Sequence, residues 1–236
     1  TGKTVSRFTH VHRNVEDLIK KVKLLRVLGQ KTGSCFQRCV GLDGINAAYS
    51  VTYEIDRKCG TDYFERFKKW LAYIQEENLM VVGAMTDPKG DRSKGPAEQV
   101  DPDQYLRIVE RRDDGLVIRG AKLHMTGGVN SHEILIMPTT AMDEKSKDYA
   151  VVCAIPADAS GVTMIFGRQA NDDRKDNRER IDSGNPLFGG VGGEAVIAFE
   201  DVFVPWERVF MNGETEFTNA LVYRFAAHHR ANYGGC

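Results

Sequence analysis

The chain has 236 residues, of which 42% are hydrophobic and 28% charged, and its 32 basic and 33 acidic side chains leave a formal net charge of −1. This composition provides enough apolar residues for a globular core and excludes intrinsic disorder. The even charge balance argues against a dominant nucleic-acid function, and no apolar run approaches the roughly 18 residues that span a membrane.

The first third of the chain has helical periodicity. Apolar residues recur at helical spacing after Asn14, which is available as an N-cap, and acidic residues follow at positions 16 and 17. Gly33 and Gly41 interrupt this pattern, and further helical stretches run over 43–53 and 62–78. We therefore predict two or three helices before residue 80.

After Leu79 the pattern changes to short β-branched runs between turn residues, which is typical of strands. The predicted strands are 81–82, 106–110, 116–119, 133–137, 150–155, 162–165 and 194–199. Asp113-Asp114-Gly115 indicates a hairpin turn, and the regular spacing predicts a small antiparallel barrel or sandwich. A charged stretch at 170–180 favours a solvated loop.

Helical spacing returns from Glu216 to Cys236. We therefore predict an α+β protein with a helical domain over 1–79, a β-domain over 80–209, and the first helix of another helical domain over 210–236. Thr1 is not an initiator methionine, and the helical pattern is still running at Cys236. We expect a fragment of a longer protein, cut on both sides.

The five cysteines, an odd number at irregular spacing, favour metal or redox use in a reducing compartment over a disulfide framework. No secretory signal is visible, so we expect a cytoplasmic protein. Cys35 and Cys39 lie four residues apart, which on a helix stacks their thiols on one face, where both can hold one metal centre. Two small buried core residues are an equal alternative.

The last eight residues offer the other half of a metal site. His229, Tyr233 and Cys236 stand at i, i+4 and i+7, so one helical face would carry all three, whereas His228 points about a third of a turn away. A satisfied histidine and a frayed terminal cysteine are the alternatives. Three thiolates and one imidazole suit structural zinc, although the C-x3-C spacing is wider than a zinc knuckle, or an iron–sulfur cluster.

Two further segments and one acidic residue are candidates for ligand binding. Residues 85–92 form a polar loop, rich in proline and glycine, that either connects elements or binds a ligand. His124-Met125-Thr126 and two glycines follow a strand and offer amides and a hydroxyl to a flat cofactor ring, without the GxGxxG of a Rossmann site. Glu194 follows two glycines, and a solvated strand start is its alternative role.

Together these segments resemble those of a known family. The motifs are GQKT before Cys35-Phe36-Gln37-Arg38-Cys39, TDPKGDR at 86–92, HMTGG at 124–128, FEDVFVPWER at 199–208 and residues 229–236. They are similar to motifs of the 4-hydroxybutyryl-CoA dehydratases, within the 4-hydroxyphenylacetate 3-hydroxylase superfamily. The resemblance covers essentially the whole chain and about the middle half of a family member. It implies an acyl-CoA dehydrogenase-like fold whose C-terminal helical bundle only begins here, and a homotetramer.

The resemblance also implies a function, namely FAD- and [4Fe-4S]-dependent radical dehydration of the acyl-CoA substrate 4-hydroxybutyryl-CoA to crotonyl-CoA, with isomerisation of vinylacetyl-CoA. The implied cluster ligands are Cys35, Cys39, His229 and Cys236. The implied catalytic residues are His229, Tyr233, Glu194 and Gln37. The implied FAD contacts are Met85, Thr86, Asp87, Pro88, Lys89, Gly90, Asp91, Arg92, His124, Met125 and Thr126.

Two other functions stay open. A two-component flavin-dependent aromatic monooxygenase of the same superfamily would make the thiols incidental, and a zinc-stabilised binding module would leave the flavin loops unexplained. Bound iron and sulfide would distinguish the dehydratase from both. The phosphates of CoA need basic side chains, for which Lys89, Arg92 and Lys122 are candidates.

Overall fold

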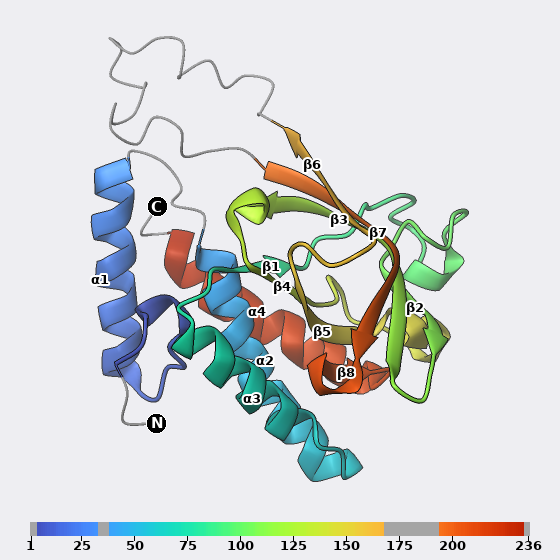
Figure 1. The fold of residues 1–236 in the computed structure, drawn as a ribbon, viewed down its shortest axis with the longest axis horizontal. Helices are drawn as coiled ribbons and strands as arrows, with labels where there is room; N and C mark the ends of the chain where they lie inside the picture. Colours follow the sequence, from blue (N-terminus) through green and yellow to red (C-terminus); the bar gives the residue numbers. More distant parts are fainter. Residues whose placement is uncertain (1–3, 33–37, 168–193, 234–236) are drawn as a thin grey trace.

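The computed structural model describes residues 4–32, 38–167 and 194–233 (Figure 1). The helices are α1 (Val15–Thr32), α2 (Cys39–Cys59), α3 (Tyr63–Glu76) and α4 (Thr218–Tyr233). The strands are β1 (Val81–Ala84), β2 (Arg107–Arg111), β3 (Gly115–Thr126), β4 (Glu133–Ile136), β5 (Val151–Pro156), β6 (Val162–Gly167), β7 (Glu194–Pro205) and β8 (Val209–Asn212). The predicted α+β order of helices, sheet and a final helix is confirmed.

The helix boundaries follow from local chemistry. The side chain of Asn14 accepts a hydrogen bond from the Asp17 amide at 3.0 Å, which confirms the predicted cap of α1. Helix α2 ends where Gly60 adopts a left-handed conformation, with φ of 70°. Gly41 does not interrupt a helix as predicted, because it lies inside α2, where its missing side chain serves packing. Among the described helices, none combines the length and hydropathy that a bilayer span requires.

The described strands form two four-stranded sheets, in the orders β1-β4-β5-β8 and β2-β3-β7-β6. The hairpin between β2 and β3 is confirmed by the bond from the Arg112 amide to the Gly115 carbonyl, at 2.8 Å. The prediction of purely antiparallel pairing is wrong for β1 and β4, which run parallel because the chain crosses to the other sheet between them. Strand β8, which pairs with β5, was not predicted.

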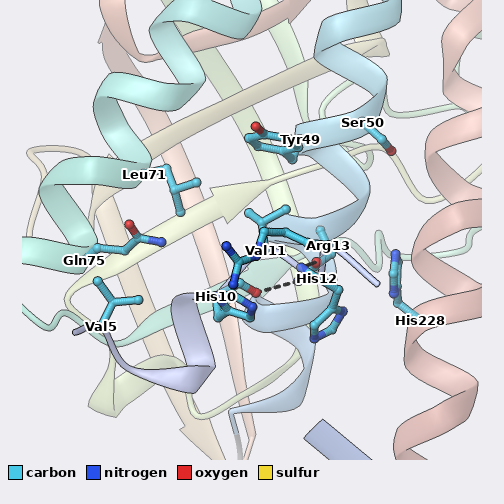
Figure 2. A pocket seen from close by; sticks show the side chains of 11 residues that line it. Val5, His10, Val11, His12, Arg13, Tyr49, Ser50, Leu71, Gln75 and His228 are labelled. Carbon is cyan, nitrogen blue, oxygen red and sulfur yellow. Dashed lines mark hydrogen bonds between the residues drawn. The ribbon is translucent and has the colours of Figure 1, made fainter. Parts of the chain in front are cut away.

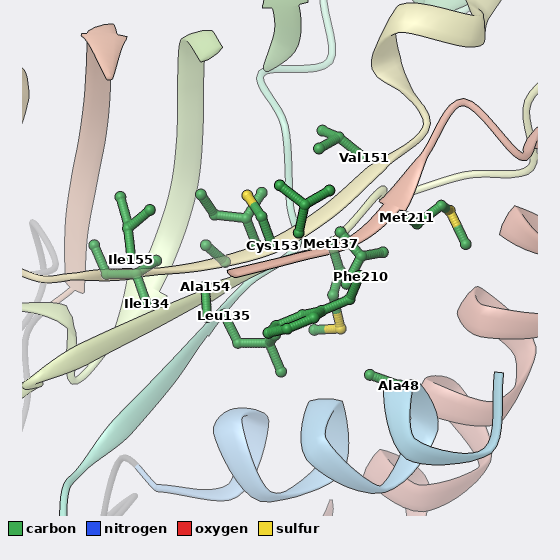
Figure 3. Close-up of a cluster of buried hydrophobic side chains, with 14 of the residues drawn as sticks. Ala48, Ile134, Leu135, Met137, Val151, Cys153, Ala154, Ile155, Phe210 and Met211 are labelled. Carbon is green, nitrogen blue, oxygen red and sulfur yellow. The ribbon is translucent and has the colours of Figure 1, made fainter. Parts of the chain in front are cut away.

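One hydrophobic core joins the helices to both sheets. Phe210 of β8 points toward the helices (Figure 3), and its ring lies 5.1 Å from that of Phe67 and 5.7 Å from that of Trp70, both on α3. Figure 1 shows α1 at the edge of the molecule, with α2 between it and the sheets. Helix α2 therefore separates α1 from the sheets, whereas α3 packs directly on β8.

Two glycines allow α2 and β1 to approach closely. A Cβ atom on Gly41 would lie 2.0 Å from the carbonyl oxygen of Val81, and one on Gly83 would lie 2.7 Å from a methyl group of Val40. No larger residue fits either position without movement of the backbone. The start of α2 is thus fixed against the strand that leads into residues 85–92.

Candidate functional site

A buried aspartate joins three helices near the C-terminal end of α4. Asp43 of α2 accepts a hydrogen bond from Nζ of Lys21, on α1, at 2.5 Å through Oδ1. Its Oδ2 lies 2.8 Å from Nδ1 of His229, on α4. Both side chains of the ion pair are fully buried, and the imidazole is 20% exposed. Because an ionised carboxylate only accepts hydrogen bonds, Nδ1 of His229 carries the proton.

Cys39 and His229 lie at the same end of the α2–α4 helix pair. The helices run antiparallel, since Arg224 bonds Glu54 at 2.7 Å and His229 bonds Asp43. Cys39 is buried one turn before Asp43, on the same face of α2. The structure therefore brings two of the four expected metal ligands to one end of the pair.

The remaining expected residues of this group are not fully described. Cys35, Gln37 and Cys236 lie outside the described residues, and of Tyr233 only the backbone is described, in the last turn of α4. Within the described ranges no three histidine, cysteine or acidic side chains are grouped as metal ligands.

One part of the cysteine prediction is wrong. A single helix carrying Cys35 and Cys39 would have to pass through Arg38, whose φ of −120° and ψ of −3° precede the first helical residue. Because α2 begins at Cys39, that thiol stands at the positive end of the helix dipole.

The loop at 85–92 is anchored by a buried ion pair. Asp87 and Lys122 are almost fully buried and lie 2.7 Å apart, and Lys122 also donates to the carbonyl oxygens of Met85 and Met137, at 3.0 and 2.9 Å. Burial raises the pKa of Asp87 and lowers that of Lys122, while their mutual attraction opposes both shifts. Lys122 was one of three candidates for the CoA phosphates, and its side chain is 2% exposed and bound to Asp87, which leaves Lys89 and Arg92 as the accessible candidates.

Hydrogen bonds from neighbouring segments hold the rest of this loop. Gln99 donates to the Asp91 carbonyl at 2.9 Å and accepts from the Asp91 amide at 3.0 Å. Tyr105 donates to the carbonyl of Lys89 at 3.2 Å, and Gln104 donates to that of Pro88 at 3.4 Å. Gly90 has φ of 53°, and Arg92 is exposed. The loop is thus held in one conformation by hydrogen bonds from neighbouring segments.

Glu194 connects the two strands at the centre of the second sheet. Its carboxylate lies 3.0 Å from Nδ1 of His124 and accepts from the hydroxyl of Thr126 at 3.1 Å. His124 has φ of 55°, a strained conformation, at an irregularity of β3 between Lys122 and Met125. The triplet 124–126 forms the last residues of β3 rather than following a strand, and the pleat buries Met125 on the opposite face.

The start of α2, the 85–92 loop and the end of β3 lie next to one another in the fold. Val40, next to Cys39, packs against Gly83, and Thr86 follows Gly83 by three residues, about 10 Å along an extended chain. The carbonyl of Thr86 accepts a hydrogen bond from the Leu123 amide at 2.7 Å, next to His124. The start of α2 therefore contacts the strand that leads into the loop, and the loop in turn contacts the end of β3.

A cavity of about 870 Å³, which the sequence did not reveal, is lined by the segment before α1 and by residues of α2, α3 and α4 (Figure 2). Its lining includes His10 and His12, from the segment before α1, and His228 of α4. The backbone amide of His12 donates to Asn46 at 2.8 Å, and its ring nitrogens have no hydrogen-bond partner among the described residues. Burial and the charge of Lys21 lower the pKa of His12 to about 4, so the ring is neutral.

Comparison with known proteins gives consistent results. Residues 1–211 match the family described as 4-hydroxyphenylacetate 3-hydroxylase N terminal. The 4-hydroxybutyryl-CoA dehydratase/vinylacetyl-CoA-Delta-isomerase of Clostridium aminobutyricum is 57% identical over 236 residues, which are 100% of this chain and 48% of that protein. The chain therefore spans about half the length of this relative.

Two solved structures are similar. The structure of an oxygen-tolerant archaeal 4-hydroxybutyryl-CoA dehydratase from N. maritimus has a TM-score of 0.93 and 52% identity, over 100% of this chain and 47% of that one. The oxygenase component of 4-hydroxyphenylacetate 3-monooxygenase, complexed with FAD, has a TM-score of 0.76 and 23% identity, over 99% of this chain and 48% of that one. The second likeness shows a shared fold.

Proposed function

The chain belongs to the 4-hydroxyphenylacetate 3-hydroxylase family, and from that premise we propose that the full-length protein is an enzyme that dehydrates 4-hydroxybutyryl-CoA to crotonyl-CoA and isomerises vinylacetyl-CoA. The observation that carries this proposal is the 57% identity, over the whole chain, to a protein of that name. The monooxygenase component that shares the fold is only 23% identical, which makes an aromatic hydroxylase the second candidate.

We propose that FAD binds at the 85–92 loop and the end of β3. The FAD complex of the oxygenase component with the same fold supports this assignment, as does the contact between the Thr86 carbonyl and the Leu123 amide. Asp87 and Met85 are buried, so their side chains would hold the loop in place and would not contact the flavin. The groups left to contact the flavin are the loop backbone, the side chains of the loop other than Met85 and Asp87, and, on β3, His124 and Thr126.

We further propose a [4Fe-4S] cluster bound by Cys35, Cys39, His229 and Cys236. The described residues fit this group, because Cys39 stands at a helix N-terminus and the bond to Asp43 leaves Nε2 of His229 as its metal-binding nitrogen. When bound, the two cofactors supply one-electron chemistry and a Lewis acid for the departing hydroxyl group.

The residues of the chain itself would then transfer protons and orient the substrate. Loss of water from a 4-hydroxyacyl thioester removes a hydrogen from a carbon that the carbonyl does not acidify, so a base must be held close to it. We propose His229 as that base when its Nε2 is not bound to the cluster, because this nitrogen could then take the proton and Asp43 would stabilise the imidazolium that results. Glu194 is proposed as an acid/base or orienting group, and Tyr233 and Gln37 as neighbours of the substrate.

The test is made with the full-length protein, purified without oxygen. We expect crotonyl-CoA from 4-hydroxybutyryl-CoA, followed by chromatography and mass spectrometry, and no hydroxylation of 4-hydroxyphenylacetate with reduced FAD and oxygen. The variant Cys39→Ala should abolish dehydration, whereas Cys59→Ala, at the exposed far end of the same helix, should leave it unchanged. Hydroxylation without dehydration would instead establish the aromatic monooxygenase.

A further inference from the structure

We propose that Lys21 and Asp43 are positioning residues that fix the tautomer and the direction of the His229 imidazole. This inference rests on the proposed role of His229 as a ligand of an iron–sulfur cluster. It assigns a function to a buried ion pair that lies outside every motif of the sequence.

Three contacts hold the histidine from different sides. Asp43 bonds Nδ1 at 2.8 Å, and Phe225, one turn earlier on α4, stacks against the ring with centroids 5.3 Å apart and planes at 20°. Lys21 donates to the backbone carbonyl of His228 at 3.3 Å as well as to Asp43. The edge of the ring, its face and the adjoining backbone are thus all fixed.

The burial of this pair argues for a role beyond packing. The side chains of Lys21 and Asp43 are 0% exposed, and removing an ammonium and a carboxylate from water is costly even when they pair. An apolar pair of similar volume would join α1 to α2 at lower cost. What an apolar pair lacks is an anionic acceptor for Nδ1–H.

The acceptor determines which nitrogen can bind a metal. A proton on Nδ1 leaves the lone pair of the neutral ring on Nε2, the nitrogen that points away from Asp43. Histidine ligands of metals commonly donate their other N–H to such a carboxylate, and loss of that partner costs roughly 10–100-fold in metal affinity. Lys21 holds the carboxylate in place.

The discriminating variant is Asp43→Asn in the full-length protein. An amide has a single oxygen, which Lys21 would take, so its NH₂ would face Nδ1 and favour the tautomer protonated on Nε2. We expect roughly tenfold faster loss of iron to a chelator, and loss of the histidine nitrogen hyperfine coupling from the reduced cluster. FAD content should be unchanged, because the hydrogen bonds described for Asp43 are to Lys21 and His229 and not to the flavin loops.

Two controls separate positioning from stability. Thr52→Val removes another buried hydrogen bond of α2, from the hydroxyl to the carbonyl of Ala48 at 2.8 Å, and should leave iron release and the nitrogen coupling unchanged. If Asp43→Asn fails to fold, the double variant Lys21→Met/Asp43→Leu buries no charge, leaves no acceptor for Nδ1–H and should fold. It should still lack the coupling.

The outcomes are distinct. Wild-type iron release and nitrogen coupling in the folded Asp43→Asn or double variant would overturn the positioning role. A wild-type protein that binds no iron would instead refute the cluster on which the inference rests.

Discussion

At the scale of single residues, the molecule buries two lysines that the sequence presents as ordinary basic residues. Lys21 and Lys122 are among its largest fully buried side chains, and each is paired with an aspartate, Asp43 and Asp87 respectively. Neither pairing follows from spacing, since the partners lie 22 and 35 positions apart on different elements. Buried charge in both cases supports a segment that we assign to a cofactor.

The Lys122 pair gives the first prediction. Lys122→Met leaves the Asp87 carboxylate buried without a cation, which typically costs about 3–5 kcal/mol of folding free energy. The variant should also retain less FAD, since Lys122 holds the carbonyl of Met85 at the start of the flavin loop. Thermal unfolding and flavin absorbance of the purified full-length protein measure both effects.

The double variant Lys122→Met/Asp87→Asn is the control for buried charge. It should recover most of the lost stability, because neither position is then ionised. A Lys122→Met variant as stable as the wild type would show that the ion pair does not anchor the loop.

His12 gives a prediction for pH dependence. Its folded pKa of about 4 lies below the ordinary 6.5, because burial and the charges of Lys21, His228 and His10 outweigh the attraction of Asp43. The unfolded chain therefore binds more protons between these values, so the contribution of His12 to stability is complete above pH 6.5 and is lost as the pH falls toward 4. The ring is half-buried, which limits the loss to about 1 kcal/mol at pH 5.

The measurement is the midpoint of thermal unfolding of the full-length protein at pH 7.5 and pH 5. His12→Gln, which does not titrate, should lose less stability than the wild type over this interval. An identical loss in both proteins would mean that His12 is protonated as readily in the folded as in the unfolded state.

At the scale of elements, the contact of α2 with β1 connects the two halves of the candidate site. Gly41→Ala would place a Cβ atom 2.0 Å from the Val81 carbonyl oxygen. The strain of about 1–3 kcal/mol or more should exceed the gain of about 1 kcal/mol that alanine brings to a helix. We expect a lower unfolding midpoint together with weaker retention of iron and FAD.

Gly167→Ala on β6 is the matched control, because a Cβ atom there would meet nothing within 4 Å. It should leave stability and cofactor content unchanged. If Gly41→Ala also left the unfolding midpoint and the iron and FAD content unchanged, the close approach of α2 and β1 would not position the site.

Local signals explain which elements the sequence could predict. The cap of α1 and the Asp113-Asp114-Gly115 hairpin depend on neighbouring residues, and both are confirmed. The parallel pairing of β1 with β4 and the addition of β8 beside β5 depend on partners far along the chain. Gly41 was misread for the same reason, since its role depends on contact with Val81.

At the scale of the whole molecule, the candidate site is distributed over the helices and both sheets. The spacing of cysteine and histidine predicted Cys39 and His229, which the structure places at one end of the α2–α4 pair. The bonds of Glu194 to His124 and Thr126 also join residues that the sequence singled out separately. Asp43 could not be found this way, because its importance appears only when three helices meet.

The central claim is that this chain contributes to one site for a flavin and an iron–sulfur cluster. The most direct measurement is the iron, acid-labile sulfide, zinc and FAD content of the full-length protein, purified without oxygen. We predict about four irons, about four sulfides and one FAD per subunit. FAD without iron would contradict the cluster and favour the aromatic monooxygenase, and zinc without FAD would contradict the account as a whole.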